Sequence, residues 1–192
     1  MITFYRFTHR FKRSLLEITS DSQYVYYWNP DPLLKEKLPD NIVFEIAAGK
    51  KAYDIIRRYE DCGHFFSQKV IDVLSQFVDM SNKSYPIKIK GLDEQYYVIY
   101  NLEAYPYWNR DEDTFMHDSR YFGMQDPSTP IFGIEGTSFI MVSEEVKKAL
   151  LKNKVSNIEL VESFGCSLEE YKKIKKSKER HEVHAYRDRY QI

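Results

Sequence analysis

The stretch Phe139-Ile140-Met141-Val142-Ser143-Glu144-Glu145-Val146-Lys147-Lys148-Ala149-Leu150 indicates the fold class of this 192-residue chain. Its apolar start is typical of a buried strand, and Ser143 stands where a side chain can accept a backbone N–H at the start of a helix. The two glutamates suit the positive end of that helix dipole, and the apolar residues that follow form one helix face. A further strand is expected at 158–161. The stretch therefore predicts a strand, a serine-capped helix and a second strand.

A similar phrase occurs earlier, where Phe65-Phe66-Ser67-Gln68-Lys69-Val70 leads into a predicted helix over 68–78. Its apolar residues recur at intervals of three and four, and Ser67 is again placed as an N-cap. A strand at Ile87 and Ile89 and a β-prone run over 95–102 then predict an antiparallel hairpin around Gly91 to Glu94. The two phrases represent either an internal duplication or two independent strand, helix and strand units, and the sequence alone leaves both open.

These elements predict an α+β fold, with a mostly antiparallel sheet and serine-capped helices packed on it. Further strands are expected at 2–5, 24–28 and 41–46, whereas the stretch around Tyr53, Ile55 and Ile56 suggests a helix or irregular structure. Residues 1–166 are predicted to form a single domain. Ser167-Leu168-Glu169-Glu170 matches a capping box, which predicts a charged C-terminal helix and tail over 167–192.

Composition excludes several functional classes. The longest run without Asp, Glu, Lys or Arg is 22–30, which is far short of the ~20 apolar residues that cross a bilayer. The chain has 2 cysteines, too few for a disulfide framework, and a reducing, cytoplasmic location is expected. A net charge of −1 argues against nucleic-acid binding as a general function. Neither nucleotide-binding glycine motifs nor a serine nucleophile motif occurs, so we expect no cofactor and no enzyme activity.

The segment 93–126 is both acidic and aromatic and is the main candidate for a binding surface. Much of it, from Glu103 onward, reads as a long loop, and long loops in compact domains are often functional. Carboxylates could attract a basic protein partner, and aromatic side chains could anchor it. The alternative is a solvated acidic loop whose aromatic residues pack on the sheet. The predicted partner-binding residues are Tyr105, Tyr107, Trp108, Asp111, Glu112 and Asp113.

A metal-dependent hydrolase or nuclease is the alternative function. Asp111, Glu112 and Asp113 with His117 could hold a divalent ion that activates water. No second ligand cluster supports this, and His181 and His184 lack the spacing of the zinc-protease motif. We therefore predict no metal site.

The stretch 139–150, with Thr129-Pro130-Ile131-Phe132 before it and Ile158-Glu159-Leu160 after it, resembles a group of bacterial immunity proteins that protect cells from polymorphic toxins. The resemblance extends over Gly63 to Val161, including Phe66-Ser67-Gln68-Lys69-Val70 and the hairpin near Tyr97. It implies a small cytoplasmic α+β inhibitor that binds a cognate toxin domain without turnover or cofactor. No catalytic residues carry over from it.

Overall fold

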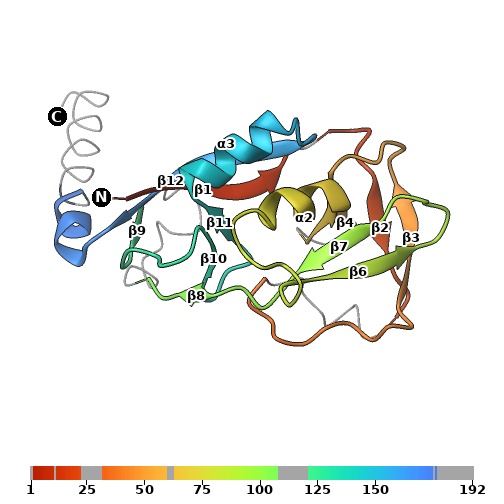
Figure 1. The fold of residues 1–192 in the computed structure, drawn as a ribbon, viewed down its shortest axis with the longest axis horizontal. Coiled ribbons are helices and arrows are strands. Elements are labelled where there is room, and N and C mark those ends of the chain that lie inside the picture. The colour runs from red at the N-terminus through yellow and green to blue at the C-terminus, as the bar shows by residue number, and fades with distance from the viewer. Residues whose placement is uncertain are drawn as a thin grey trace, which may run out of the picture.

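The computed structural model describes residues 2–10, 12–22, 32–59, 63–107, 121–174 and 176. The strand expected at 24–28 lies outside these ranges. Two groups of six strands form the molecule, with two helices between them (Figure 1). No helix in the described part of the chain has the length and apolar character needed to cross a membrane.

One group of strands closes into a barrel, in the order β2-β3-β6-β7-β5-β4. Its elements, with the helix α2, are β2 (Glu17–Thr19), β3 (Val43–Ala48), β4 (Ile55–Arg58), β5 (His64–Ser67), α2 (Gln68–Leu74), β6 (Ser84–Ile89) and β7 (Tyr96–Ile99). We call these elements the barrel half. The expected hairpin is confirmed as β6 and β7, and Gly91 in its turn has a φ of 79° that favours glycine.

The other group forms a sheet in the order β8-β10-β11-β1-β12-β9. Its elements, with the helix α3, are β1 (Ile2–His9), β8 (Ala104–Tyr105), β9 (Tyr121–Gly123), β10 (Ile131–Ile134), β11 (Ile140–Val142), α3 (Glu144–Lys152) and β12 (Ile158–Cys166). We call these elements the sheet half. All of them come from the second part of the chain except β1, which lies between β11 and β12.

The α+β class is confirmed, but the predicted arrangement of a mostly antiparallel sheet covered by helices is wrong. Both groups of strands are mixed, with parallel pairs β2–β4 and β3–β6 in the barrel and β8–β10 and β12–β9 in the sheet. The stretch around Tyr53, Ile55 and Ile56, expected to be helical or irregular, contains strand β4 from Ile55 onward. Alternation and turn signals report local conformation, so they could not show which distant strands pair.

The two halves have the same strand order and the same strand directions. The barrel sequence β2-β4-β5-β7-β6-β3 corresponds strand by strand to β8-β10-β11-β1-β12-β9, with every parallel and antiparallel pair matched. In each half the helix connects two parallel strands that are separated by one antiparallel strand, which is a split βαβ unit. That central strand is β7 in the barrel half and the N-terminal β1 in the sheet half.

The pairing registers of the two halves also coincide. Equivalent residues, barrel half first, are Phe66 and Val142 directly before each serine, Ile55 and Ile131 paired with them on one side, and Tyr97 and Tyr5 on the other. The sequence adds a further match, because the pattern Tyr-Trp-Asn-x-Asp occurs at 27–31 and at 107–111. These two stretches contain both tryptophans of the chain, and all their residues except Tyr107 lie outside the described ranges. This agreement favours an internal duplication over two independent units.

The helices α2 and α3 lie between the two halves rather than covering one sheet, and we call this region the seam (Figure 1). A single hydrophobic cluster joins α2, α3 and the facing strands, and includes Val70, Leu74, Val146 and Leu150. Strands beside this seam are buried on both faces. Phe66 faces the seam while its neighbour Phe65 lies in the barrel interior, which explains why these strands read as continuous apolar runs.

The predicted serine caps differ in outcome. Ser143 accepts a hydrogen bond from the backbone N–H of Val146 and caps α3 as expected. Ser67 occupies the N-cap position of α2, but its side chain makes no capping bond, so that prediction is wrong. At the C-terminal end, Ser167 and Glu170 form the predicted reciprocal capping box ahead of a helix at 168–174. The rest of the predicted charged tail, 177–192, lies outside the described residues.

Candidate functional site

The described part of the predicted partner-binding surface begins at Tyr105 on the edge strand β8. Its hydroxyl donates a hydrogen bond of 2.6 Å to the Glu103 carboxylate and accepts one of 2.7 Å from the backbone N–H of Ser128. Its ring packs edge-on against Phe132, with ring centroids 5.3 Å apart. Tyr105 is therefore a half-buried, fixed residue at the edge of the sheet.

Tyr107 lies in a different environment. Its side chain is 8% exposed and belongs to the hydrophobic cluster on the face of the sheet opposite the helices. There its ring meets Phe122 edge-on, with ring centroids 6.1 Å apart. In this conformation the ring contributes to the core. The other predicted contacts, Trp108, Asp111, Glu112 and Asp113, lie outside the described residues, as does His117 of the alternative metal site. Partner binding by these residues stays a prediction.

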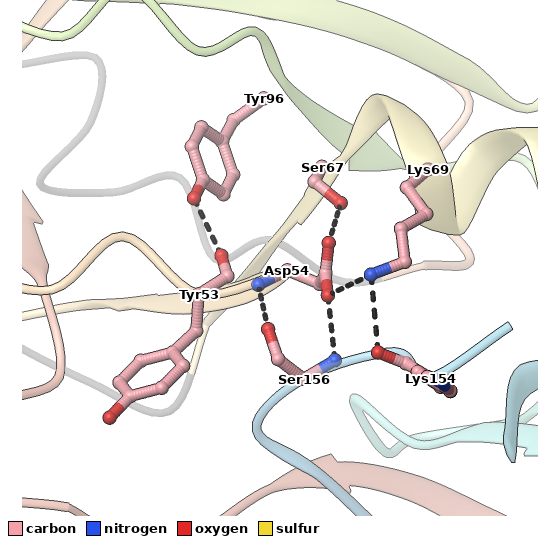
Figure 2. Close-up of polar contacts among 7 residues, drawn as sticks. All are labelled: Tyr53, Asp54, Ser67, Lys69, Tyr96, Lys154 and Ser156. Atoms are coloured by element: carbon pink, nitrogen blue, oxygen red, sulfur yellow. Dashed lines mark hydrogen bonds and ion pairs between the residues drawn. The ribbon is translucent and has the colours of Figure 1, made fainter.

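A polar cluster around Asp54 lies where the two halves meet (Figure 2). The Asp54 carboxylate accepts hydrogen bonds from the Ser67 hydroxyl, the Lys69 ammonium and the Ser156 backbone N–H, at 2.8, 2.8 and 2.6 Å. Ser156 returns a bond, because its hydroxyl accepts the Asp54 N–H at 2.9 Å. Lys69 also donates to the carbonyl of Lys154 at 3.1 Å. The cluster thus joins β4, the start of α2 and the turn after α3.

The chemistry of this cluster suits a structural link. Burial alone would raise the pKa of the Asp54 carboxyl, but the hydrogen bonds from Lys69, Ser156 and Ser67 outweigh it and hold the pKa below its ordinary value. A carboxylate stabilised by this many donors is a poor proton acceptor. Ser67 donates to that carboxylate rather than to a base that could activate it as a nucleophile.

Two histidines form a second contact between the halves. Nδ1 of His9 on β1 lies 2.8 Å from Nε2 of His64 on β5, and their rings meet edge-on. Burial lowers the pKa of His64 to about 3, with a smaller effect from His9 and Arg57, and burial also lowers the pKa of His9. Both rings are therefore neutral near pH 7, and one N–H is shared between them.

The described ranges contain no group of three or more His, Cys, Asp or Glu side chains placed to hold a metal ion. A cavity of about 300 Å³ lies between residues 38–44 and β6. Ile42, Phe44 and Tyr85 line it, and its charged groups, Asp40 and Lys88, are exposed.

The Asp54 cluster and the histidine pair were not predicted from the sequence. Asp54 and Ser156 are 102 positions apart, and His9 and His64 are 55 apart. Each residue is also unremarkable in its local sequence, so no local motif could have identified either group.

Comparison with known proteins adds no relatives. No protein-family model matches the chain, and a search of curated proteins gave no significant match. The resemblance to immunity proteins therefore remains an expectation from the residues quoted for it.

Proposed function

We propose that this chain is a non-catalytic protein-binding module, an immunity protein that neutralises a cognate bacterial toxin in the cytoplasm by binding to it. The observation that carries the proposal is the anchored edge at β8. The Tyr105 hydroxyl is tied to Glu103 and Ser128, so the aromatic and acidic segment that follows departs from a fixed point.

The position of this segment supports a role in binding. Strands β8 and β9 are consecutive in the chain but form the two opposite edges of the sheet, so residues 108–120 connect one edge to the other. Connections of this length between strands are often functional. The carboxylates of Asp111, Glu112 and Asp113 would accelerate encounter with a basic toxin domain, and Trp108 would supply contact energy.

The polar groups between the halves also favour binding over turnover. The Asp54 carboxylate is fully engaged by donors, and the histidine pair is neutral and largely buried. Neither arrangement offers a strong base or an activated nucleophile. The alternative, a metal-dependent hydrolase or nuclease, depends on Asp111 to His117.

The chain supplies a matched pair of variants for the test. Trp108→Ala removes the proposed anchor, and Trp28→Ala removes the corresponding residue of the other copy of the Tyr-Trp-Asn-x-Asp motif, at 27–31. Each is co-expressed in bacterial cells with the toxin domain encoded beside its gene, and growth is measured. We expect Trp108→Ala to lose protection and Trp28→Ala to retain it, provided that both variants fold. Equal protection by both variants and the unmodified chain would reject Trp108 as the anchor.

Binding kinetics separate the roles of charge and aromatic contact. Reversal of Asp111 and Asp113 to lysine should mainly slow association and weaken its salt dependence, whereas Trp108→Ala should mainly speed dissociation, at a cost of about 2 kcal/mol in binding free energy. Calorimetry with divalent ions tests the enzyme alternative. Tight metal binding that disappears when Asp111, Glu112, Asp113 and His117 are all changed to Ala would favour the enzyme.

A further inference from the structure

Exposed and half-buried basic residues lie on the β1–β2 and β3–β4 connections, which run side by side next to the barrel. Lys12 and Lys51 place their ammonium groups 4.6 and 4.9 Å from the ring centroid of Tyr53. The same two connections carry the other members. We define the cationic patch as Arg10, Lys12, Arg13, Lys50 and Lys51.

Backbone hydrogen bonds hold the two connections together. The N–H groups of Lys50 and Lys51 both donate to the carbonyl of Ser14, at 3.2 and 2.9 Å, and the N–H of Leu16 donates to the carbonyl of Lys51 at 3.1 Å. Gly49 makes this approach possible. It has a φ of +76°, and a Cβ atom there would lie 1.8 Å from the carbonyl oxygen of Leu15. The patch is therefore built on a fixed backbone.

The described chain does not neutralise this charge. No carboxylate of the described residues forms an ion pair with a member of the patch. The nearby acidic groups are engaged elsewhere, since Asp54 binds Lys69 and Glu17 binds Arg57. The pKa of the Tyr53 hydroxyl is lowered, first by its hydrogen bond with Ser14 and then by Lys51 and Lys12, which agrees with a positive local potential.

We propose that the cationic patch is an interaction surface for an acidic protein partner, which it binds through surface carboxylates. Arginine and lysine side chains on a fixed backbone give directed, charge-assisted hydrogen bonds to carboxylates, and the hydroxyls of Ser14 and Tyr53 add polar groups between them. This surface is separate from the proposed toxin-binding segment. That segment leaves from β8, whereas the patch lies beside β2 and β3 at the other end of the molecule (Figure 1).

A protein partner fits this surface better than a nucleic acid. Sites for single-stranded nucleic acid combine a basic groove along the backbone with aromatic rings on which bases stack. Here the ring of Tyr53 already contacts two ammonium groups, and the basic residues lie on two short connections. The chain as a whole has a net charge of −1 and so lacks a general attraction for phosphates.

The test compares two probes of equal charge, a fluorescent oligoglutamate peptide and a single-stranded oligonucleotide, by fluorescence anisotropy at several salt concentrations. The variant K50E/K51E reverses two charges of the patch, and K88E/K90E reverses two exposed lysines at the C-terminal end of β6 as a control of equal charge change. We expect the intact chain to prefer the peptide, K50E/K51E to weaken peptide binding on the order of tenfold, and K88E/K90E to change it little.

Two results would overturn the proposal. One is equal weakening by K50E/K51E and K88E/K90E, which would mean that only net charge matters. The other is tighter binding of the oligonucleotide than of the peptide by the intact chain, which would assign the patch to nucleic acid. Circular dichroism of both variants establishes folding, and R10E/R13E replaces K50E/K51E if the latter does not fold. Growth protection against the toxin is measured separately, so failure of one proposal leaves the other intact.

Discussion

The barrel half and the sheet half pair their strands in the same order and register, yet the barrel half closes on itself through β2 and β3. In the sheet half the equivalent strands β8 and β9 make no pairing with each other in the described part of the chain. The β2–β3 pairing that closes the barrel contains a register shift between Glu17 and Ile18, and such irregularities bend a strand. The order in which the strands pair is therefore the same in both halves, whereas the closure of the sheet into a barrel occurs in only one of them.

The two serines show how one neighbouring side chain changes a local interaction. The backbone N–H of Ser67 donates to the carbonyl of Asp54, and that of Ser143 donates to the carbonyl of Pro130, so Asp54 and Pro130 are equivalent. Asp54 adds a carboxylate that accepts the Ser67 hydroxyl, whereas Pro130 has no acceptor in its side chain. The Ser143 hydroxyl therefore faces its own helix. Asp54 thus diverts the capping hydroxyl of Ser67 into the polar cluster in which Asp54 itself binds Ser156 of the sheet half.

The largest expected effect comes from strand β1, whose place in the chain order differs from that of its barrel-half equivalent β7. Deletion of residues 1–10 should abolish cooperative unfolding, because β1 lies in the middle of the sheet half and Phe4, Tyr5 and Phe7 are core residues. A permuted chain of residues 12–166, an Asn-Gly turn and residues 2–10 should restore it, since Ile2 pairs with Gly165. The measurement is chemical denaturation monitored by circular dichroism. Cooperative unfolding of the deletion variant would contradict the assignment of β1.

Equivalent leucines in the two helices test whether the halves are one cooperative unit. Leu74 and Leu150 stand at the same distance after their serines and are both fully buried in the shared cluster. Changing either to Ala should lower the free energy of unfolding by about 2–5 kcal/mol. We expect a single urea transition in both variants. Two separate transitions in one of them would show that the halves unfold independently.

The histidine pair should make stability depend on pH. His64 titrates at about 3 in the folded chain but near 6.5 when unfolded, so the unfolded state takes up a proton first as the pH falls. The free energy of unfolding should therefore decrease by about 1.4 kcal/mol for each pH unit between about 6.5 and about 3. His64→Phe removes this titration and should flatten the profile between pH 6 and pH 4. An unchanged slope in that variant would place the dependence on other groups.

The smallest effects on the free energy of unfolding should come from Ser67 and Ser143. The informative result is whether each effect adds to that of Asp54→Asn. Ser143→Ala removes a cap and Ser67→Ala removes a hydrogen bond to Asp54, so each should cost about 1 kcal/mol. In double-mutant cycles with Asp54→Asn, Ser67→Ala should be non-additive and Ser143→Ala additive. Additivity in both cycles would mean that Asp54 and Ser67 contribute independently.

Sequence reasoning succeeded where the signal is local. The apolar faces of the helices, the hairpin at Gly91 and the capping box at Ser167 all depend on residues within one turn or one strand of each other. It failed for strand β4 and for the Ser67 hydroxyl. β4 forms because it pairs with β2 and β5. The Ser67 hydroxyl is oriented by the carboxylate of Asp54, which directly precedes β4. The site residues after Tyr107 stay predictions.

The position of β1 also has a consequence for synthesis. The barrel half draws its strands from one continuous part of the chain, so these strands can pair soon after they emerge, whereas β1 emerges before them and must wait for its partners β11 and β12. At roughly 5–20 residues per second, an unpaired β-strand rich in aromatic residues is exposed for on the order of ten seconds. This nascent segment is where we expect chaperones to bind the growing chain.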